Sequence, residues 1–223
     1  MNHLLPRLYL LWLLIAIVLS FMVGGFKSEN ITRVCVLLFL VLQIPLASLL
    51  TNLLARFRPM LRFIATGTLL ASVVEGFHMI SKPVFDSLKI SRNSTLHQGL
   101  LNYALDLALT VPAYLVILWV IWWFINRYQY SFWQYTLIMG LGQVMGDGGI
   151  YYFVAAPAML LFLPYPMSNY HAMNVLPFIS VQDELKPSQP FGWKACLAIP
   201  ALIAVYFVCG AIIRVIGNAL GLT

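Results

Sequence analysis

Charged residues are scarce in this sequence, and their scarcity is the first guide to the class of protein. Only 9% of the 223 residues are charged, whereas 61% are hydrophobic, and the mean hydropathy is +0.88. A soluble domain contains about 25% charged residues. The composition therefore predicts an all-α, polytopic membrane protein whose residues 1–223 form a single integral membrane domain, because an isolated span must satisfy its backbone internally as a helix.

The signatures of several other functions are also missing. The three cysteines have no metal-ligand spacing, and no His-Glu-x-x-His motif occurs, so no metal site is predicted. No phosphate-binding loop, dinucleotide fingerprint or nucleophile elbow occurs, and we therefore expect no cofactor. Although the formal charge is +6, no basic run is interleaved with aromatic residues. The expected partner is therefore membrane lipid and not nucleic acid.

Long apolar segments are what the sequence has in abundance. About 20 apolar residues are needed for a membrane-spanning helix. We predict about six spans, within a range of five to seven: Leu8–Phe26, Val34–Ala55, Phe63–Ile80, Leu100–Ile125, Phe132–Leu163 and Ala195–Ile216. The fifth segment is too long for one simple span, and its glycines and prolines predict a kink or a re-entrant stretch. The proline-rich segment that follows, Pro164–Lys194, is expected to be a connection along the interface, with His171 as a loop residue.

The first segment and the orientation leave alternatives open. Leu8–Phe26 fits a retained helix, or a secretory signal peptide that lacks a clear cleavage site. With six spans the basic residues divide six against seven between the two sides, which decides no orientation. Two glycosylation sequons, at Asn30 and Asn93, fall on the same side and would make it lumenal in a host that glycosylates.

Three carboxylates lie within the apolar segments: Glu75, Asp106 and Asp147. A charged side chain at the centre of a bilayer costs roughly 2.5–3.5 kcal/mol even on the lenient insertion scale. Such residues usually face a bundle interior or a wet cavity and mark a functional site. Counting about 1.5 Å of rise per residue, all three reach the same leaflet. We therefore expect them to line one cavity that opens to lipid.

Each carboxylate has a polar neighbour at helical spacing. Residues three or four positions apart share a helix face. These neighbours are His78 for Glu75, Asn102 for Asp106, and Gln143 and Tyr151 for Asp147. Structural alternatives remain open. Asp147 also fits a role in a hydrogen bond with Gln143, Asp106 an interfacial position, and His78 a packed core histidine.

Two short motifs resemble a known family. Gly142-Gln143-x-x-Gly146-Asp147, followed by Tyr151-Tyr152-Phe153, resembles a motif of the emopamil-binding protein family in the EXPERA group. Val74-Glu75-Gly76-Phe77 is similar to that family's His-x-x-x-Glu-Gly motif, but Ala71 stands where the family has histidine. The EXPERA-like portion covers residues 63–163. The resemblance implies a sterol isomerase of the endoplasmic reticulum membrane that shifts a ring double bond without a redox cofactor.

We therefore predict a cofactor-free isomerase of an isoprenoid or sterol-like alkene. Burial keeps a carboxylic acid protonated, so that it can protonate an alkene and form a carbocation. Glu75 is the predicted proton donor, assisted by His78, and Asp106 is the predicted base or cation stabiliser. The predicted substrate-binding residues are Asn102, Gln143, Asp147 and Tyr151. The alternatives are a membrane terpene cyclase that uses the same first step, a non-catalytic sterol- or lipid-binding protein, and a proton-coupled transporter.

Overall fold

The computed structural model describes residues 4–222, apart from the side chain of Leu50, and within this part the chain forms helices and no β-strand. Five helical segments are long and apolar enough to cross a membrane. They are α1 (Leu4–Gly24), α2 (Ser28–Leu54), α3 (Pro59–His78), α4 (Leu96–Arg127), and the short η5 (Trp193–Leu197) continued by α8 (Ala198–Ala219). The predicted all-α membrane bundle is confirmed, and the chain is a multi-pass membrane protein.

Local sequence signals explain where several helices begin. Thr95 starts α4 with a capping box, in which its side chain accepts from the backbone of Gln98 and the Gln98 side chain accepts in return. Ser131 and Gln134 form the same box at the start of α5 (Phe132–Val144). Pro59 occupies the first turn of α3, where its missing N–H is not needed. Polar caps thus fix the starts of α4 and α5.

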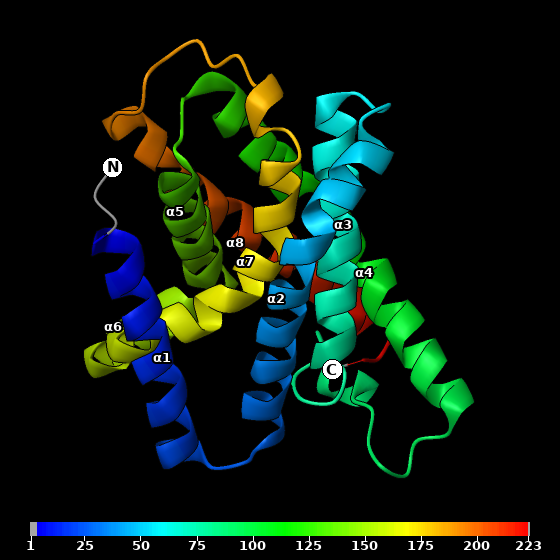
Figure 1. Cartoon of the computed structure of the whole chain (residues 1–223). Helices are drawn as coiled ribbons and strands as arrows, with labels where there is room; N and C mark the ends of the chain where they lie inside the picture. The colour runs from blue at the N-terminus through cyan, green and yellow to red at the C-terminus, as the bar shows by residue number, and fades with distance from the viewer. Residues whose placement is uncertain (1–3, 223) are drawn as a thin grey trace.

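The expected fifth span is divided into several pieces. After α5 the chain passes through a π-helical turn, η2 (Met145–Gly149), then α6 (Ile150–Ala155), η3 (Pro157–Phe162) and α7 (Pro164–Ile179). Figure 1 shows α6 lying across the direction of the long helices. The kink lies at Asp147 (φ −78°, ψ 33°) and Gly148 (φ 90°), a conformation that favours glycine. The kink that the glycines predict is confirmed.

Residues 132–179 therefore form a re-entrant segment whose two ends lie on the same side of the bundle. The ring of Tyr135, near the start of α5, stacks on Phe178, near the end of α7, with centroids 3.9 Å apart. The backbone before the segment also meets the backbone after it: the Gln129 N–H donates to the Gln189 carbonyl at 2.9 Å, and the Gln189 N–H donates to the Arg127 carbonyl at 3.1 Å. The re-entrant path explains why five long helices, and not six, cross the bundle.

The prediction that Pro164–Lys194 is a connection is wrong for its first half. Residues 164–179 form α7, which packs against α1, α2, α3 and α5. Twelve of its sixteen residues are buried, so α7 is a central helix of the bundle and not a lid. His171, expected in a loop, is only 5% exposed. Its Nε2 lies 2.6 Å from the hydroxyl oxygen of Tyr9 in α1.

The re-entrant segment also changes which basic residues share a side. Lys186 and Lys194 join Arg127, and Arg214 moves to the side of the connection between α3 and α4. The basic residues still divide almost evenly, seven against six, so they decide no orientation. The asparagines of the two sequons differ in exposure. Asn93 is exposed, whereas the side chain of Asn30 is buried and donates hydrogen bonds to the Ser20 and Gly25 carbonyls.

Candidate functional site

Glu75 lies in the last turn of α3 and faces α4. Tyr114 of α4 donates a hydrogen bond to Glu75 Oε1. The carboxyl group is half-buried, and it lies close enough to Asp106 and Asp147 for their charges to act on it. The antiparallel packing of α3 on α4 produces this pair, because residues far apart in the sequence meet across the helix interface. Glu75 is thus a carboxyl group held in place from a neighbouring helix.

Asp147 lies at the kink of the re-entrant segment and is exposed on the surface of the bundle. The Tyr170 hydroxyl of α7 donates a hydrogen bond to its Oδ2 at 2.6 Å. Gln143, the neighbour expected from helical spacing, is not its partner. The kink breaks the regular helix between residues 143 and 147, and so removes the geometry on which that expectation depended. Asp147 is held across helices in the same way as Glu75.

A buried polar network lies beside Asp147. Gln143 of α5 is completely buried, and Asn174 of α7 donates a hydrogen bond to its Oε1. Gln143 Nε2 donates in turn to the Tyr206 hydroxyl of α8 at 3.2 Å. The ring of Tyr206 meets the ring of Tyr170 edge-on, with centroids 6.3 Å apart. The network therefore connects α5, α7 and α8 around the kink.

Tyrosines of the site were missed by sequence reasoning. Tyr114, Tyr170 and Tyr206 come from three different helices and surround Glu75 and Asp147 with hydroxyl groups and aromatic faces. No spacing signal links them, because they meet only through tertiary packing. The one sequence signal that could have found these tyrosines is that each lies in a segment with other polar residues. Tyrosine is common in membrane helices, so this signal is weak.

Asp106 and Asn102 hold the connection between α3 and α4. Asp106 is completely buried, its Oδ1 accepts from the Val84 N–H at 2.9 Å, and its Oδ2 has no partner among the described residues. Asn102 Nδ2 donates to the Leu88 carbonyl at 3.1 Å. Both side chains point into the connection, and neither forms a hydrogen bond to Glu75 in the part of the chain that the structure describes.

The remaining predicted residues do not join the acids. Within residues 4–222, the His78 side chain forms no hydrogen bond to Glu75, whose partner is Tyr114. Tyr151 is 70% exposed and stacks on Phe207, with centroids 5.6 Å apart. Of the predicted set, the structure thus groups Glu75, Gln143 and Asp147 in one region. Asp106 also lies near Glu75, but both Asp106 and Asn102 bond to the connection. Among the described residues, His78 and Tyr151 lie outside the polar contacts of the acids.

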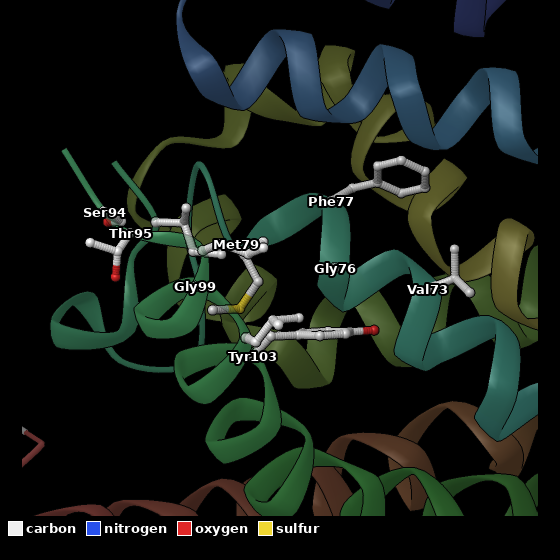
Figure 2. Close-up of a pocket in the computed structure, with 11 residues that line it drawn as sticks. Val73, Gly76, Phe77, Met79, Ser94, Thr95, Gly99 and Tyr103 are labelled. Atoms are coloured by element: carbon white, nitrogen blue, oxygen red, sulfur yellow. The ribbon is translucent and has the colours of Figure 1, made fainter. Parts of the chain in front are cut away.

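An open cavity of about 600 Å³ lies between the end of α3, the connection and the start of α4. Figure 2 shows Ser94 and Thr95 at one end, Val73 at the other, and Tyr103 along one side. The Tyr103 hydroxyl donates to the Ser72 carbonyl at 2.6 Å. None of the three carboxylates lines this cavity. The expectation that they share it is therefore wrong for this cavity, which lies beside the acids on the other side of Tyr103.

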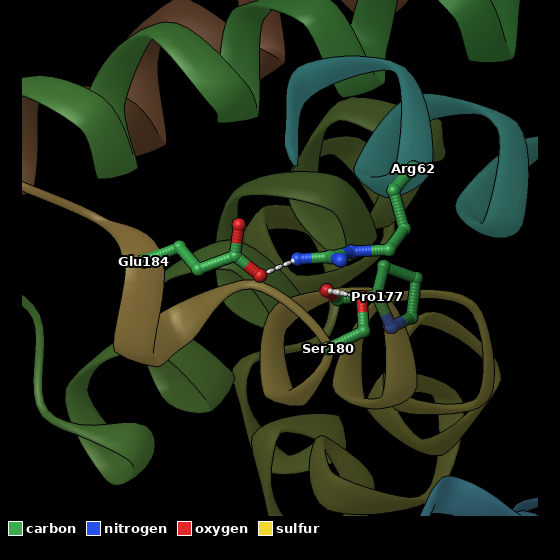
Figure 3. A network of polar contacts seen from close by, with 4 residues as sticks. All are labelled: Arg62, Pro177, Ser180 and Glu184. Atoms are coloured by element: carbon green, nitrogen blue, oxygen red, sulfur yellow. Dashed lines mark hydrogen bonds and ion pairs between the residues drawn. The ribbon is translucent and has the colours of Figure 1, made fainter. Parts of the chain in front are cut away.

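An ion pair ties the turn after α7, Gln182–Glu184, to the start of α3 (Figure 3). Arg62 is completely buried and donates to Glu184, whose side chain is about half exposed. Arg62 Nε and Nη1 have no partner among the described residues. Ser180 Oγ donates to the Pro177 carbonyl at 2.7 Å beside this pair. The pair fixes the chain that leaves the re-entrant segment.

Among residues 4–222, no three His, Cys, Asp or Glu side chains gather closely enough to hold a metal ion. Comparison of the chain with protein-family models, curated proteins and solved structures finds no match. The resemblance to the emopamil-binding protein family therefore rests on its two motifs and stays a prediction.

Proposed function

We propose that this chain is a membrane-embedded isomerase that moves a double bond in an isoprenoid or sterol-like alkene without a cofactor. The observation that carries the proposal is the pair of hydrogen bonds that join apolar helices, Tyr114 to Glu75 and Tyr170 to Asp147. Two carboxyl groups positioned in this way provide an acid and a base at one place. Carboxyl groups in membrane helices are costly and are usually retained for function.

The proposed reaction transfers one proton in and one proton out. Glu75 donates a proton to one alkene carbon, and the π electrons form the new C–H bond and leave a carbocation. Asp147 removes a proton from a carbon next to the cation, and those C–H electrons form the shifted double bond. Asp147 then releases this proton to water, and Glu75 takes up another proton from water, which completes the cycle. The aromatic faces of Tyr170 and Tyr206 would stabilise the cation.

This proposal differs from the sequence prediction in the identity of the base. Asp106 is completely buried and bound to the Val84 N–H, so a substrate would have to displace the connection to reach it. Asp147 is exposed and bound through one oxygen only. We therefore assign the base to Asp147 and a structural role to Asp106.

The experiment is turnover by purified protein in deuterated water, with sterol and linear isoprenoid alkenes as substrates. Glu75→Gln and Asp147→Asn are each expected to lower deuterium incorporation by about 10²–10⁴-fold, the usual effect of losing a positioned acid or base. Glu29→Gln, at an exposed acid in the first turn of α2, is the matched control. Asp106→Asn is expected to lower the yield of folded protein and not the rate per folded molecule.

Two results would contradict the proposal. One is normal incorporation by well-folded Glu75→Gln, and the other is the absence of incorporation by the unmodified protein with every alkene tested. Binding of the alkenes without incorporation would favour the non-catalytic lipid-binding alternative. A cyclic product from a linear alkene would identify the cyclase alternative.

One observation favours proton-coupled transport as a second candidate. The helix is broken at Asp147 and Gly148, and transporters often place broken helices and ionisable residues at their binding sites. Protein reconstituted in vesicles would then move protons together with a solute. The isomerase proposal predicts turnover in detergent without any gradient.

A further inference from the structure

The shape of the cavity beside α3 suits a single hydrocarbon chain. Its lining is mostly apolar and runs along the last turns of α3 from Val73 to Met79, about 9 Å of helix axis at 1.5 Å per residue. Leu96 and Leu100 line it and are exposed, so the cavity opens towards the bilayer. Its volume lies within the roughly 300–1,000 Å³ range of ligand pockets.

Two polar side chains, Ser94 and Thr95, line the end of the cavity where the connection between α3 and α4 meets α4, and Figure 2 shows both at the end opposite Val73. The hydroxyl of Tyr103, which also lines the cavity, points towards the Val73 end and donates to the Ser72 carbonyl. Gly76 lets the Tyr103 ring approach α3, because a Cβ at Gly76 would lie 3.4 Å from the Tyr103 hydroxyl oxygen. The cavity therefore has a polar mouth at the membrane surface and an apolar interior, which is the polarity of a lipid.

The connection that forms this mouth carries exposed positive charge. Lys82, Lys89 and Arg92 are exposed, with Asp86 as the one exposed acid between them. Lys89 directly precedes Ile90, which lines the cavity, and Arg92 is two residues from Ser94. Both basic residues thus lie within two residues of the part of the connection that lines this end of the cavity.

The basic residues stand on an ordered scaffold. The Ile90 N–H donates to the Met79 carbonyl at 2.8 Å, and the Val84 N–H donates to Asp106 at 2.9 Å. Asn102 holds the Leu88 carbonyl at 3.1 Å. These contacts fix the connection to α3 and α4, so that binding a ligand at the mouth does not require ordering a loop.

We propose that this cavity binds one acyl chain of an anionic phospholipid, with its phosphate held by Lys89 and Arg92. A phosphate provides the negative charge that the connection attracts, and the chain fills the apolar interior. A neutral lipid would use the interior but would gain nothing from the basic residues. The inference does not depend on the isomerase proposal, because the three carboxylates lie outside the cavity.

The experiment uses the delipidated full chain in detergent and two photoreactive lipids with identical acyl chains, phosphatidylglycerol and phosphatidylcholine. Native mass spectrometry measures the affinity for each lipid, and peptide mapping after cross-linking identifies the residues that contact its acyl chain. We expect phosphatidylglycerol to bind more tightly and to label residues between 73 and 103. The double variant Lys89→Gln/Arg92→Gln should lower its affinity about 25-fold, roughly fivefold for each charge, and leave phosphatidylcholine unchanged.

Matched variants distinguish the contribution of the acyl chain to binding from that of the headgroup. Lys186→Gln/Lys194→Gln removes two charges from the opposite side of the bundle and should leave the affinity for both lipids unchanged. Leu100 is an exposed residue of the cavity lining, and Leu100→Trp should reduce labelling by both lipids about tenfold. Leu115→Trp, at a separate apolar groove, should not reduce it. Because Leu100 is exposed, its replacement should leave folding intact.

Four outcomes would overturn the proposal. The first is equal affinity for the two lipids, and the second is labelling that maps outside residues 73–103. The third is phosphatidylglycerol binding that the Lys89→Gln/Arg92→Gln variant does not weaken. Displacement of both lipids by a sterol at equal concentration would assign the cavity to a neutral ligand and would also overturn it.

Discussion

The hydrogen bond between Asn174 and Gln143 allows a direct test of the central position of α7. Asn174→Leu keeps nearly the same size and removes the group that donates to Gln143 Oε1. Gln143 is completely buried, so its oxygen would lose its partner away from water. Leaving a buried acceptor unpaired costs about 1–3 kcal/mol. Asn174 Oδ1 already has no partner among the described residues, and its removal offsets part of this cost, so we expect about 1–2 kcal/mol.

The matching double variant measures the bond itself. Gln143→Leu alone should also destabilise the protein, because it leaves the Asn174 amide and the Tyr206 hydroxyl without this partner. Gln143→Leu/Asn174→Leu removes both ends and should cost less than the sum of the single changes. In membrane bundles such coupling averages about 0.6 kcal/mol and reaches about 1.7 kcal/mol. We expect a value within this range.

The assay is reversible unfolding in mixed micelles with increasing dodecyl sulfate, followed by circular dichroism. Asn218→Leu, in an exposed position near the end of α8, is the control and should change the unfolding free energy by less than about 0.5 kcal/mol. If Asn174→Leu behaves like this control, or if the two single changes are additive, α7 does not pack on α5 as described.

Three further predictions address the kink, a cap and the site. Gly148→Ala should destabilise the protein by about 1–2 kcal/mol in the same assay, because φ is 90° at this position. Gly192→Ala is the control and should not destabilise it, because φ is negative there and the space around it is open. Thr95→Ala should cost about 0.5–2 kcal/mol through loss of the capping box, and an unchanged midpoint would contradict that box. Tyr170→Phe should slow deuterium incorporation about tenfold or more, since a hydrogen bond to a charged group contributes about 1.5–3 kcal/mol, and a normal rate would remove Tyr170 from the site.

Hydropathy and glycine position were sufficient to predict the long helices and the kink. Apolar length identifies the five long helices, and Gly148 adopts a positive φ that the absence of a side chain permits. The carboxylates were also found from sequence, because an acid in an apolar segment is conspicuous. Their grouping at one site depends on the packing of α3, α4 and α7, and only its rough depth could be estimated beforehand.

Tertiary contacts explain what sequence reasoning missed. The segment that forms α7 contains prolines and polar side chains. These residues lower its hydropathy, and the low hydropathy predicted an exposed connection. In the bundle His171 meets Tyr9, and Asn174 meets Gln143, so these polar groups are satisfied without water. The predicted neighbours of the acids failed for the same reason. Glu75 and Asp147 bond to tyrosines on other helices, which no local spacing reveals.

The order of these segments along the chain has a consequence for biosynthesis. α7 is too short and too polar to enter a bilayer readily on its own, yet its partners Tyr9, Gln43 and Gln143 all precede it in the sequence. When α7 leaves the ribosome, those side chains are already in the membrane to receive it. α8 emerges last, and its Tyr206 then completes the contacts of Gln143. Synthesis in this direction therefore delivers α7 to the membrane only after these three partners have been made.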